Sequence, residues 1–325
     1  MIENLDLRPS QSPGIGLLNL VPISNRGDDS IAPIAGAFAS VLNQIFSRVG
    51  YKLLFLCLFC FPFLLKAVEA QKLETAQEKP IVVVIPSYNN KDWYQKNLDS
   101  VFAQDYKNFR IIYIDDASPD GTGTLVKAYI KEKKLQHRAT VIQNPKRIGS
   151  LANIYKGIWL CAPDEIVANL DGDDWFAHEY VLKKLNEVYA DPNVWVTYGQ
   201  FVYYPCGSPG WAAQVASEII EQNAFRENQW TTTALRSFYA GLFQKIKIDA
   251  LLHEGEFFPM AGDLAYMWPI LEMAGTHSRF IPEVLYVYNV VTPINDQKVD
   301  PTYQQNLGFA TRRKQKYSPI ERPYD

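Results

Sequence analysis

The chain has 325 residues, of which 47% are hydrophobic, so it is long enough to bury a large core and is not a disordered protein. Its 32 Lys and Arg residues stand against 35 Asp and Glu residues, and the net charge of -3 excludes the basic footprint of a nucleic-acid-binding protein. The four cysteines lack metal-ligand spacing with histidine, which excludes a recognisable zinc site or disulfide framework.

The N-terminal part divides into a polar leader and an apolar segment. Residues 1–30 show no sustained apolar period, and we expect residues 1–48 as a whole to form a poorly ordered leader. Residues 53–65 are uncharged and the most hydrophobic stretch of the chain. Residues 49–70 therefore predict either a secretory signal with a small-residue cleavage site or an uncleaved membrane anchor. Basic residues flank both ends, so the side of the membrane that the rest of the chain faces stays open.

After a polar linker, strands and helices alternate along the chain. Residues 81–85 and 109–114 are β-branched or apolar runs that predict strands, and residues 139–143 predict a short one. Apolar residues at helical spacing predict helices over 92–104 and 124–134. This alternation predicts an α/β domain whose mostly parallel central sheet is covered by helices on both faces.

The second half of the chain keeps this rhythm only at first. A buried strand leads into the acidic segment 166–175, and a further strand over 194–202 would complete the sheet by about residue 204. Residues 205–235 break the pattern and predict a mobile or acceptor-side insertion, while 235–252 predict a helix beneath the site. Residues 285–288 predict another strand, and the polar, basic residues 293–325 predict a surface or disordered tail.

Three carboxylates end the buried strand at Asp171, Asp173 and Asp174. The carboxyl end of a buried strand is where an α/β sheet opens its ligand crevice. Because three adjacent acids repel one another unless a cation offsets them, oxygen ligands in this spacing favour Mg²⁺ or Mn²⁺. The alternative is an acidic turn that caps the next helix without metal. Farther on, Asp263 stands among apolar neighbours at a predicted helix start, and is either a helix cap or a catalytic base.

Four segments in this order carry a family resemblance: IVVVIPSYNN (81–90), IIYIDDASPDGT (111–122), VANLDGDDW (167–175) after a helix with Asn153, and AGD (261–263). Together they resemble the family 2 glycosyltransferases, which have the Rossmann-like GT-A fold of nucleotide-diphospho-sugar transferases. The resemblance covers about residues 79–292.

The resemblance implies a role for each motif. It implies an inverting transferase that moves a sugar from a UDP- or GDP-sugar to a glycan, lipid-linked or protein-linked acceptor, with Asp263 as catalytic base. Asp171 and Asp173 form the Asp-x-Asp motif that would hold Mn²⁺ or Mg²⁺ against the diphosphate. Many family members have Glu-Asp where this chain has Gly262-Asp263. The donor nucleotide would lie against Pro86, Ser87, Tyr88, Asn89, Asp115, Asp116, Arg147 and Asp171.

Other functions fit the sequence less well. A nucleotidyltransferase would carry a Gly-rich, basic phosphate loop after the first strand, and a NAD-dependent enzyme would carry Gly-x-Gly-x-x-Gly there; the segment PSYNN is neither. A catalytically degenerate protein that only binds carbohydrate or nucleotide remains the alternative, because a fold does not guarantee an activity. Such a protein is expected to have lost the metal acids or the base, and this chain has both.

Overall fold

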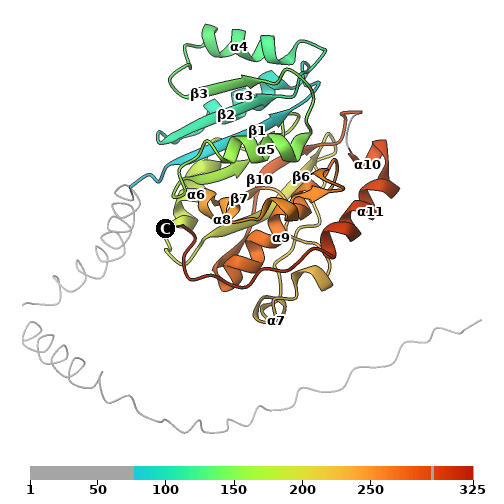
Figure 1. Ribbon diagram of the computed structural model, residues 1–325. Helices are drawn as coiled ribbons and strands as arrows, with labels where there is room; N and C mark the ends of the chain where they lie inside the picture. The colour runs from blue at the N-terminus through green and yellow to red at the C-terminus, as the bar shows by residue number, and fades with distance from the viewer. Residues whose placement is uncertain (1–76, 294–295, 325) are drawn as a thin grey trace, which may run out of the picture. The chain divides into compact units, whose positions relative to one another are not determined.

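The computed structural model describes residues 77–293 and 296–324, all within one compact unit (Figure 1). The predicted leader and the apolar segment 49–70 lie outside the described residues. Within the described part, the helices are all too short or too polar to cross a membrane.

The core of the unit is an eight-stranded sheet with the order β3-β2-β1-β4-β7-β6-β10-β5. Strands β7 and β5 run antiparallel to their neighbours and the other pairs are parallel, which confirms the mostly parallel sheet. The strands are β1 Ile81–Ser87, β2 Phe109–Asp115, β3 Ala139–Gln143, β4 Ile166–Asn169, β5 Trp175–Phe176, β6 Val196–Tyr204, β7 Arg236–Tyr239 and β10 Ser278–Asn289. A separate hairpin pairs β8 Leu252–His253 with β9 Glu256–Phe257.

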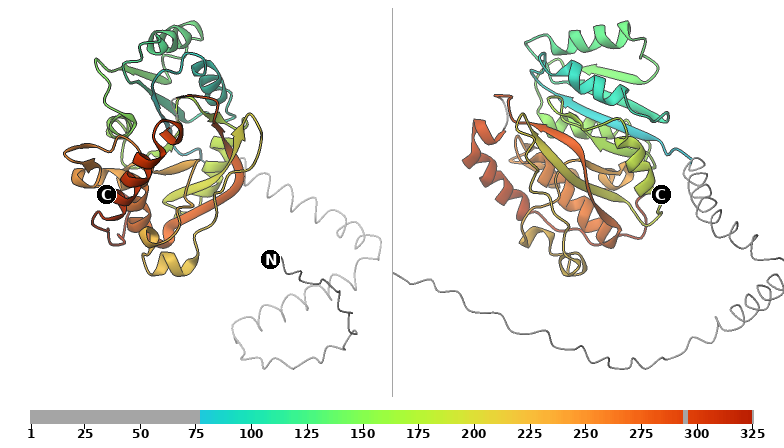
Figure 2. Two further views of the ribbon diagram at one scale, coloured as in Figure 1. Left: turned by 90° about the vertical axis from the view of Figure 1, so that its right-hand side faces the viewer. Right: turned by 180° about the vertical axis from the view of Figure 1, so that it is seen from behind.

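Helices cover both faces of the sheet (Figures 1 and 2). In α5, Gly157 lies against the side chains of Val84 and Ile114, whereas Gly123 in α4 lies against Asp115. Because successive residues of a strand point to opposite faces, Ile114 and Asp115 place α5 and α4 on opposite sides of the sheet. The main helices are α3 Tyr94–Phe102, α4 Thr122–Glu132, α5 Ser150–Ile158, α6 Val181–Tyr189, α9 Gly262–Ala274 and α11 Pro301–Arg312, with shorter α7 Ser217–Glu221, α8 Ala240–Gln244 and α10 Asp296–Val299.

The central strands β1 and β4 are apolar up to their last residues, Ser87 and Asn169, because both faces are covered. All seven residues of β1 and all four of β4 are buried. Helix α5 packs closely on these strands because Gly157 has no side chain: a Cβ added there would lie 2.7 Å from Val84 Cγ1. The carboxyl ends of β1 and β4 therefore form a closely packed base for the loops that follow these two strands.

The sheet is not complete by residue 204, contrary to the sequence prediction. The segment 235–252, predicted as a helix, begins with strand β7, and only Ala240–Gln244 are helical before a short 3-10 turn at Ile248–Ala250. Strand β7 lies between β4 and β6, and β10 is longer than predicted and pairs with β6. The prediction failed because Phe238, Tyr239, Leu242 and Phe243 suit a buried strand followed by a turn of helix as well as one helix.

The C-terminal residues 296–324 are folded, which corrects the alternative of a disordered tail for 293–325, although most of these residues lie at the surface as the other alternative predicted. Helix α11 packs on α9 (Figure 1) and buries Leu307, which is 1% exposed. After α11, Ile320 N–H donates to Met273 O at 3.0 Å, and the Tyr324 ring meets Tyr239 edge-on. Polar composition was misleading because the few apolar residues of this segment, such as Leu307, are enough to anchor it to the core.

The insertion 205–235 is likewise anchored to the core. Arg226, in a short 3-10 helix at Phe225–Glu227, is 4% exposed and forms a two-pronged ion pair with Glu272 of α9. The same guanidinium donates to the carbonyls of Thr311 and Lys314. Arg226 thus ties the insertion, α9 and the C-terminal segment together.

Candidate functional site

A cavity of about 300 Å³ opens at the sheet edge where the parallel strands end. Its walls come from the residues that follow β1 and β4, the ends of β6 and β10, the start of β7, and the N-terminus of α9. Crevices at the carboxyl ends of strands are the usual ligand sites of open α/β sheets. This cavity is therefore the candidate active site.

The acidic turn after β4 is held in place by its third carboxylate. Asp174 is 1% exposed; it accepts a 2.5 Å hydrogen bond from the Tyr286 hydroxyl and a 2.7 Å bond from the backbone N–H of Asn289. Burial and the neighbouring Asp173 and Asp171 raise the pKa of Asp174 well above its ordinary value. Asp174 is therefore a structural acid that fixes the turn.

The other two acids of the turn, Asp171 and Asp173, line the cavity. Burial raises the pKa of Asp171, and the charge of Arg236 opposes that shift. Within the described residues no three acidic, His or Cys side chains converge on one metal position. Two carboxylates facing a cavity still fit Mg²⁺ or Mn²⁺, because these ions are usually held by one or two carboxylates together with substrate phosphates.

The acidic turn lies close against the end of β1. A Cβ added at Gly172 would lie 2.6 Å from Ser87 Oγ, so only glycine fits between Asp171 and Asp173 without a shift. Gly172 N–H also donates to Pro86 O at 3.0 Å. The segment 81–90 and the acidic turn therefore pack directly against each other.

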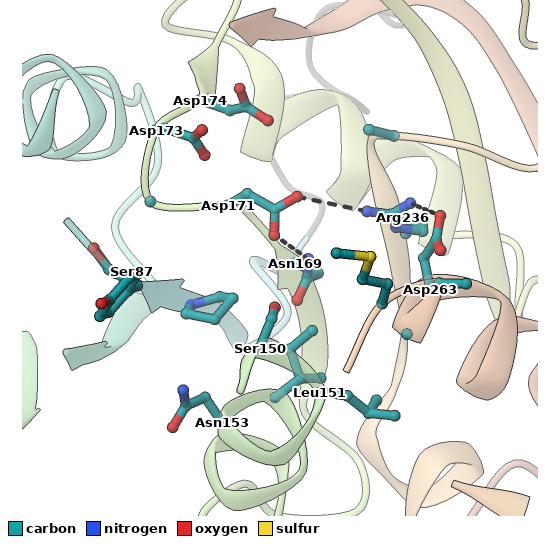
Figure 3. A pocket seen from close by; sticks show the side chains of 18 of the residues that line it. Ser87, Ser150, Leu151, Asn153, Asn169, Asp171, Asp173, Asp174, Arg236 and Asp263 are labelled. Carbon is teal, nitrogen blue, oxygen red and sulfur yellow. Dashed lines mark hydrogen bonds and ion pairs between the residues drawn. The ribbon is translucent and has the colours of Figure 1, made fainter. Parts of the chain in front are cut away.

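Arg236 is the main site residue that the sequence analysis missed. Strand β7 runs antiparallel to β4, so its first residue, Arg236, pairs with the last residue of β4, Asn169. The guanidinium is buried between two acids (Figure 3): Nη1 lies 3.1 Å from Asp263 Oδ2 and Nη2 lies 3.8 Å from Asp171 Oδ2. Burial acts to lower the pKa of Arg236, but Tyr266 and the carboxylates of Asp263 and Asp171 raise it above its ordinary value.

Asp263 is not the cap of α9. The cap position is Ala261, in the left-handed conformation with φ 54°, and no side chain caps the helix. Asp263 instead lies in the first turn, lines the cavity, and has a side chain that is 35% exposed. Its carboxylate is thus partly open to a ligand and oriented by Arg236, which a base requires and a helix cap does not.

The loop after β1 and the loop that carries Arg147 form a second part of the cavity wall. Pro86, Ser87 and Tyr88 line it as predicted, and the Arg147 guanidinium lies over the Tyr88 ring at 4.0 Å. Asn89 is not among the lining residues: its φ is 56°, and its N–H donates to Ser118 Oγ. Asn90 lines the cavity in its place.

The two acids after β2 differ in their surroundings. Asp115 is buried and lies outside the cavity lining. Asp116 lines the cavity, but its carboxylate accepts hydrogen bonds from Asn144 Nδ2 and from the backbone N–H groups of Ile148 and Gly149. These bonds outweigh burial and lower the pKa of Asp116. Asp116 therefore shapes the loop that carries Arg147.

Several lining residues were not predicted as site residues. Arg236 is the one charge within the segment 234–239, a signal that the sequence did contain. Asn90 and Asn169 lie within two of the motifs but were not assigned a role, and the remaining residues come from segments that only the fold brings to the cavity. Besides Arg236, the lining residues that were not predicted include Asn90, Asn169, Phe201, Tyr203, Trp211, Thr233, Tyr266, Tyr286, Tyr288 and Gln304.

Comparison with known proteins identifies the family. Residues 82–249 match the family model described as glycosyl transferase family 2. The chain belongs to this family. The match includes the acidic turn and Arg236 but ends before Asp263.

Family 2 relatives match over part of their length. Glycosyltransferase GlyA of Streptococcus pneumoniae is 28% identical over 183 residues, which cover 52% of this chain and 26% of the relative. The putative teichuronic acid biosynthesis glycosyltransferase TuaG of Bacillus subtilis is 32% identical over 108 residues, 33% of this chain and 41% of the relative. The matched part thus spans less than half of each of these relatives.

Solved structures share the fold. The mannosyltransferase PcManGT of Pyrobaculum calidifontis, in complex with GDP-Man and Mn²⁺, has a TM-score of 0.53 at 19% identity and covers 81% of this chain and 76% of its own. Residues 1–349 of S. aureus TarS have a TM-score of 0.50 at 18% identity, covering 65% of this chain and 60% of the other. These likenesses confirm the GT-A fold that the motifs implied.

Proposed function

We propose that the chain is an inverting, metal-dependent glycosyltransferase that transfers a sugar from a UDP- or GDP-sugar to an acceptor hydroxyl. The observation that carries the proposal is the position of Arg236 between Asp171 and Asp263 in one cavity. On one side of Arg236, Asp171 belongs to the acidic turn that is suited to hold a divalent cation. On the other side, Asp263 is a partly exposed carboxylate that is suited to act as a base, and sugar transfer needs both groups.

The donor nucleotide is assigned to the part of the cavity formed by the β1 loop. Tyr88 and the guanidinium of Arg147 above it offer a stacked, positively charged surface for a base, ribose or phosphate. The side chains of Asn90 and Asn153 add amides that can form hydrogen bonds in the same part of the lining.

Asp171 and Asp173 are assigned to a divalent cation that the diphosphate would also ligate. When bound, such a cation stabilises the negative charge that builds up on the departing nucleoside diphosphate. The residues of the chain do the rest: Asp174 and Tyr286 keep the turn fixed, and Gly172 lets it approach Ser87.

Asp263 is assigned as the base that takes the proton from the acceptor hydroxyl. Arg236 holds the carboxylate by one oxygen, and the side chain remains partly exposed toward the cavity. An acceptor oxygen that loses its proton to Asp263 attacks the anomeric carbon from the side opposite to the diphosphate, which inverts that centre. The proposed metal acids and Asp263 line the same cavity, so a donor held by the metal can meet an acceptor hydroxyl that Asp263 activates.

Two variants test the proposal against a degenerate binding protein. Calorimetry of the full chain with UDP and then GDP, each with and without Mn²⁺, identifies the donor class. We expect Asp173→Ala to lose the metal-dependent part of nucleotide binding and turnover. Asp263→Asn should bind the donor normally and lose at least about 100-fold in kcat, the usual contribution of a general base.

The outcomes separate the assignments. Turnover that is unchanged in Asp173→Ala would remove the metal assignment, and a near-normal rate in Asp263→Asn would remove the base. Nucleotide binding by the wild-type chain with no sugar transfer or donor hydrolysis under any condition would favour the degenerate binding protein.

We also propose that residues 49–70 attach the chain to a membrane, because this stretch is the most hydrophobic part of the sequence. Membrane fractionation of the full chain, compared with a chain that starts at residue 71, tests this. Equal distribution of the two forms in the soluble fraction would contradict it.

A further inference from the structure

Four aromatic side chains form one wall of the cavity, and the proposed chemistry does not use them. They are Phe201 and Tyr203 of β6, Tyr288 of β10 and Trp211, here called the aromatic wall. Ring centroids of Phe201 and Tyr203 lie 5.0 Å apart, those of Tyr203 and Tyr288 5.9 Å, and those of Phe201 and Trp211 6.5 Å. Every one of these pairs meets edge-to-face, so the rings hold one another in fixed orientations.

The sheet places this wall next to the acidic turn. Tyr203 pairs with Tyr288 across the parallel strands β6 and β10. Tyr286 is two residues before Tyr288, so both side chains point to the same face, and the Tyr286 hydroxyl bonds to Asp174. The aromatic wall therefore lies on the strands that hold the acidic turn.

A tight turn after β6 brings Trp211 onto the wall. Gly207 N–H donates to Tyr203 O, Tyr203 N–H to Ser208 O, and Gly210 N–H to Phe201 O, so the chain folds back along its own strand. A Cβ at Gly210 would lie 2.3 Å from the Phe201 ring, which means that the close approach requires glycine. Trp211 is nevertheless 45% exposed. A large apolar ring that is held rigidly at a cavity yet left half in water is suited to cover a ligand.

We propose that the aromatic wall is the acceptor subsite and that it binds a pyranose ring of a saccharide acceptor through the apolar C–H face of the sugar. This inference rests on the proposed transferase function and specifies its acceptor class. Flat rings with polar edges match a pyranose, which has an apolar face and a rim of hydroxyl groups. Polar side chains of the same lining, Thr233 and Gln304, are available to those hydroxyls.

Two other occupants of the wall fit less well. The nucleotide base of the donor is already assigned to a different part of the cavity, at Tyr88 and Arg147. A lipid chain favours a groove of aliphatic side chains, whereas Tyr203 and Tyr288 bring hydroxyl groups to the wall, and Thr233 and Gln304 add polar atoms to the same cavity. The wall also shares the cavity with Asp263, so a sugar stacked on it has its hydroxyls within the chamber that holds the base.

The test compares two exposed tryptophans in the full chain. Trp211→Ala removes the outer ring of the wall, and Trp159→Ala is the matched control, because Trp159 is 50% exposed and lies outside the cavity lining. The probes are methyl glycosides and trisaccharides of glucose, galactose and N-acetylglucosamine, with decyl phosphate as the lipid-like alternative. Binding to donor-loaded protein is measured by saturation-transfer NMR, and transfer by product formation.

For the saccharide that binds, we expect Trp211→Ala to raise the acceptor KM about 10-fold, a stacking contribution of the usual size. Trp211→Phe should recover most of the affinity, and Trp159→Ala should behave as wild type. Saturation transfer should be strongest at the ring C–H protons of the sugar. Circular dichroism and donor binding of Trp211→Ala check that the variant is folded.

Three results would overturn the inference: an unchanged acceptor KM in Trp211→Ala, binding of decyl phosphate in preference to the saccharides, or binding of no saccharide in the panel. Failure of the proposed function gives a different result. In that case the wild-type chain, without any acceptor, does not hydrolyse a sugar nucleotide, whether or not it binds one.

Discussion

Arg236 Nη1 donates a 3.1 Å hydrogen bond to the carboxylate of Asp263, and the guanidinium that makes this bond is the first side chain of β7. The partner of Arg236 in the sheet is Asn169, two residues before Asp171. The orientation of Asp263 is therefore set from the strand that supports the acidic turn. A displacement of the acidic turn and a displacement of Asp263 would each alter the contacts of Arg236.

Replacement of Arg236 should affect catalysis more than donor binding. In Arg236→Met the Asp263 carboxylate loses its orienting donor, and we expect kcat to fall roughly 100-fold, the usual effect of a displaced catalytic group. The two acids also lose a buried cation, so the free energy of unfolding should fall by roughly 3 kcal/mol. Steady-state kinetics and urea denaturation measure the two effects.

Arg236→Lys is the control for charge alone. Lysine keeps the positive charge but cannot reach two carboxylates with one planar group, so we expect stability close to wild type and only partial activity. Full activity of Arg236→Met would show that Asp263 needs no orientation by this residue.

The acid sensitivity of the domain should depend on Asp116. Burial acts to raise the pKa of Asp116, but hydrogen bonds from Asn144, Ile148 and Gly149 outweigh it, so the folded-state pKa is below the ordinary value. A lowered folded-state pKa contributes stability above the unfolded-state pKa of about 3.9, and this contribution is lost as the pH falls through the folded-state value.

Asp116→Asn should therefore reduce stability at pH 7 and show a shallower decline of the free energy of unfolding below about pH 4 than the wild type. Urea denaturation at a series of pH values gives both slopes. Parallel slopes for the two proteins would mean that the hydrogen bonds to Asp116 do not depend on its charge.

Gly172→Ala should disturb the acidic turn. The new Cβ would lie 2.6 Å from Ser87 Oγ and 2.7 Å from Asn90 Nδ2, so the turn or the β1 loop must move. We expect weaker metal-dependent nucleotide binding and a loss of about 1–3 kcal/mol in stability from overpacking. Calorimetry with nucleotide and Mn²⁺ measures the first effect.

Gly308→Ala is the matched glycine substitution. Its Cβ would meet Leu264 Cδ1 at 3.4 Å, an ordinary contact, and α11 would gain a better helix-forming residue. Nucleotide binding should stay unchanged. If Gly172→Ala binds nucleotide as tightly as Gly308→Ala, the close approach of the turn to β1 is not needed for the site.

The two cysteines of the described residues should differ in reactivity. The Cys206 thiol is exposed, and its hydrogen bond with Ser208 lowers its pKa, whereas burial raises the pKa of Cys161 to about 12. Because the thiolate is the reactive form, iodoacetamide at neutral pH should modify Cys206 and spare Cys161 until the protein unfolds. Peptide mapping by mass spectrometry identifies the modified residue, and early labelling of Cys161 would contradict its burial.

The sequence predicted the first half of the fold because its signals there are local. The run Ile81–Ile85 is buried on both faces, and the alternation with helices determines a parallel sheet through β4. The acidic turn and Asp263 were also found, because acids that interrupt apolar runs are visible in the sequence itself. The resemblance to family 2 was confirmed by the match over residues 82–249.

The remainder of the site depends on pairings between distant segments. Arg236 reaches Asp171 only because β7 runs against β4, and Tyr286 reaches Asp174 only because β10 joins β6. The hydrophobic periodicity of a single segment does not show which strands will pair or in which register. The C-terminal segment was mispredicted for a related reason: Arg312 lies over the Trp268 ring, a partner that composition does not show.

The position of β7 also determines the order in which the domain can be assembled. Because β7 separates β4 from β6, a nascent chain that has reached residue 204 contains two strands whose facing edges have no partner yet. Both edges remain open to pairing with other chains until residues 236–239 leave the ribosome and insert between them. Fragments that end before residue 236 should therefore aggregate, and any fusion or truncation of this protein has to keep the chain intact through β7.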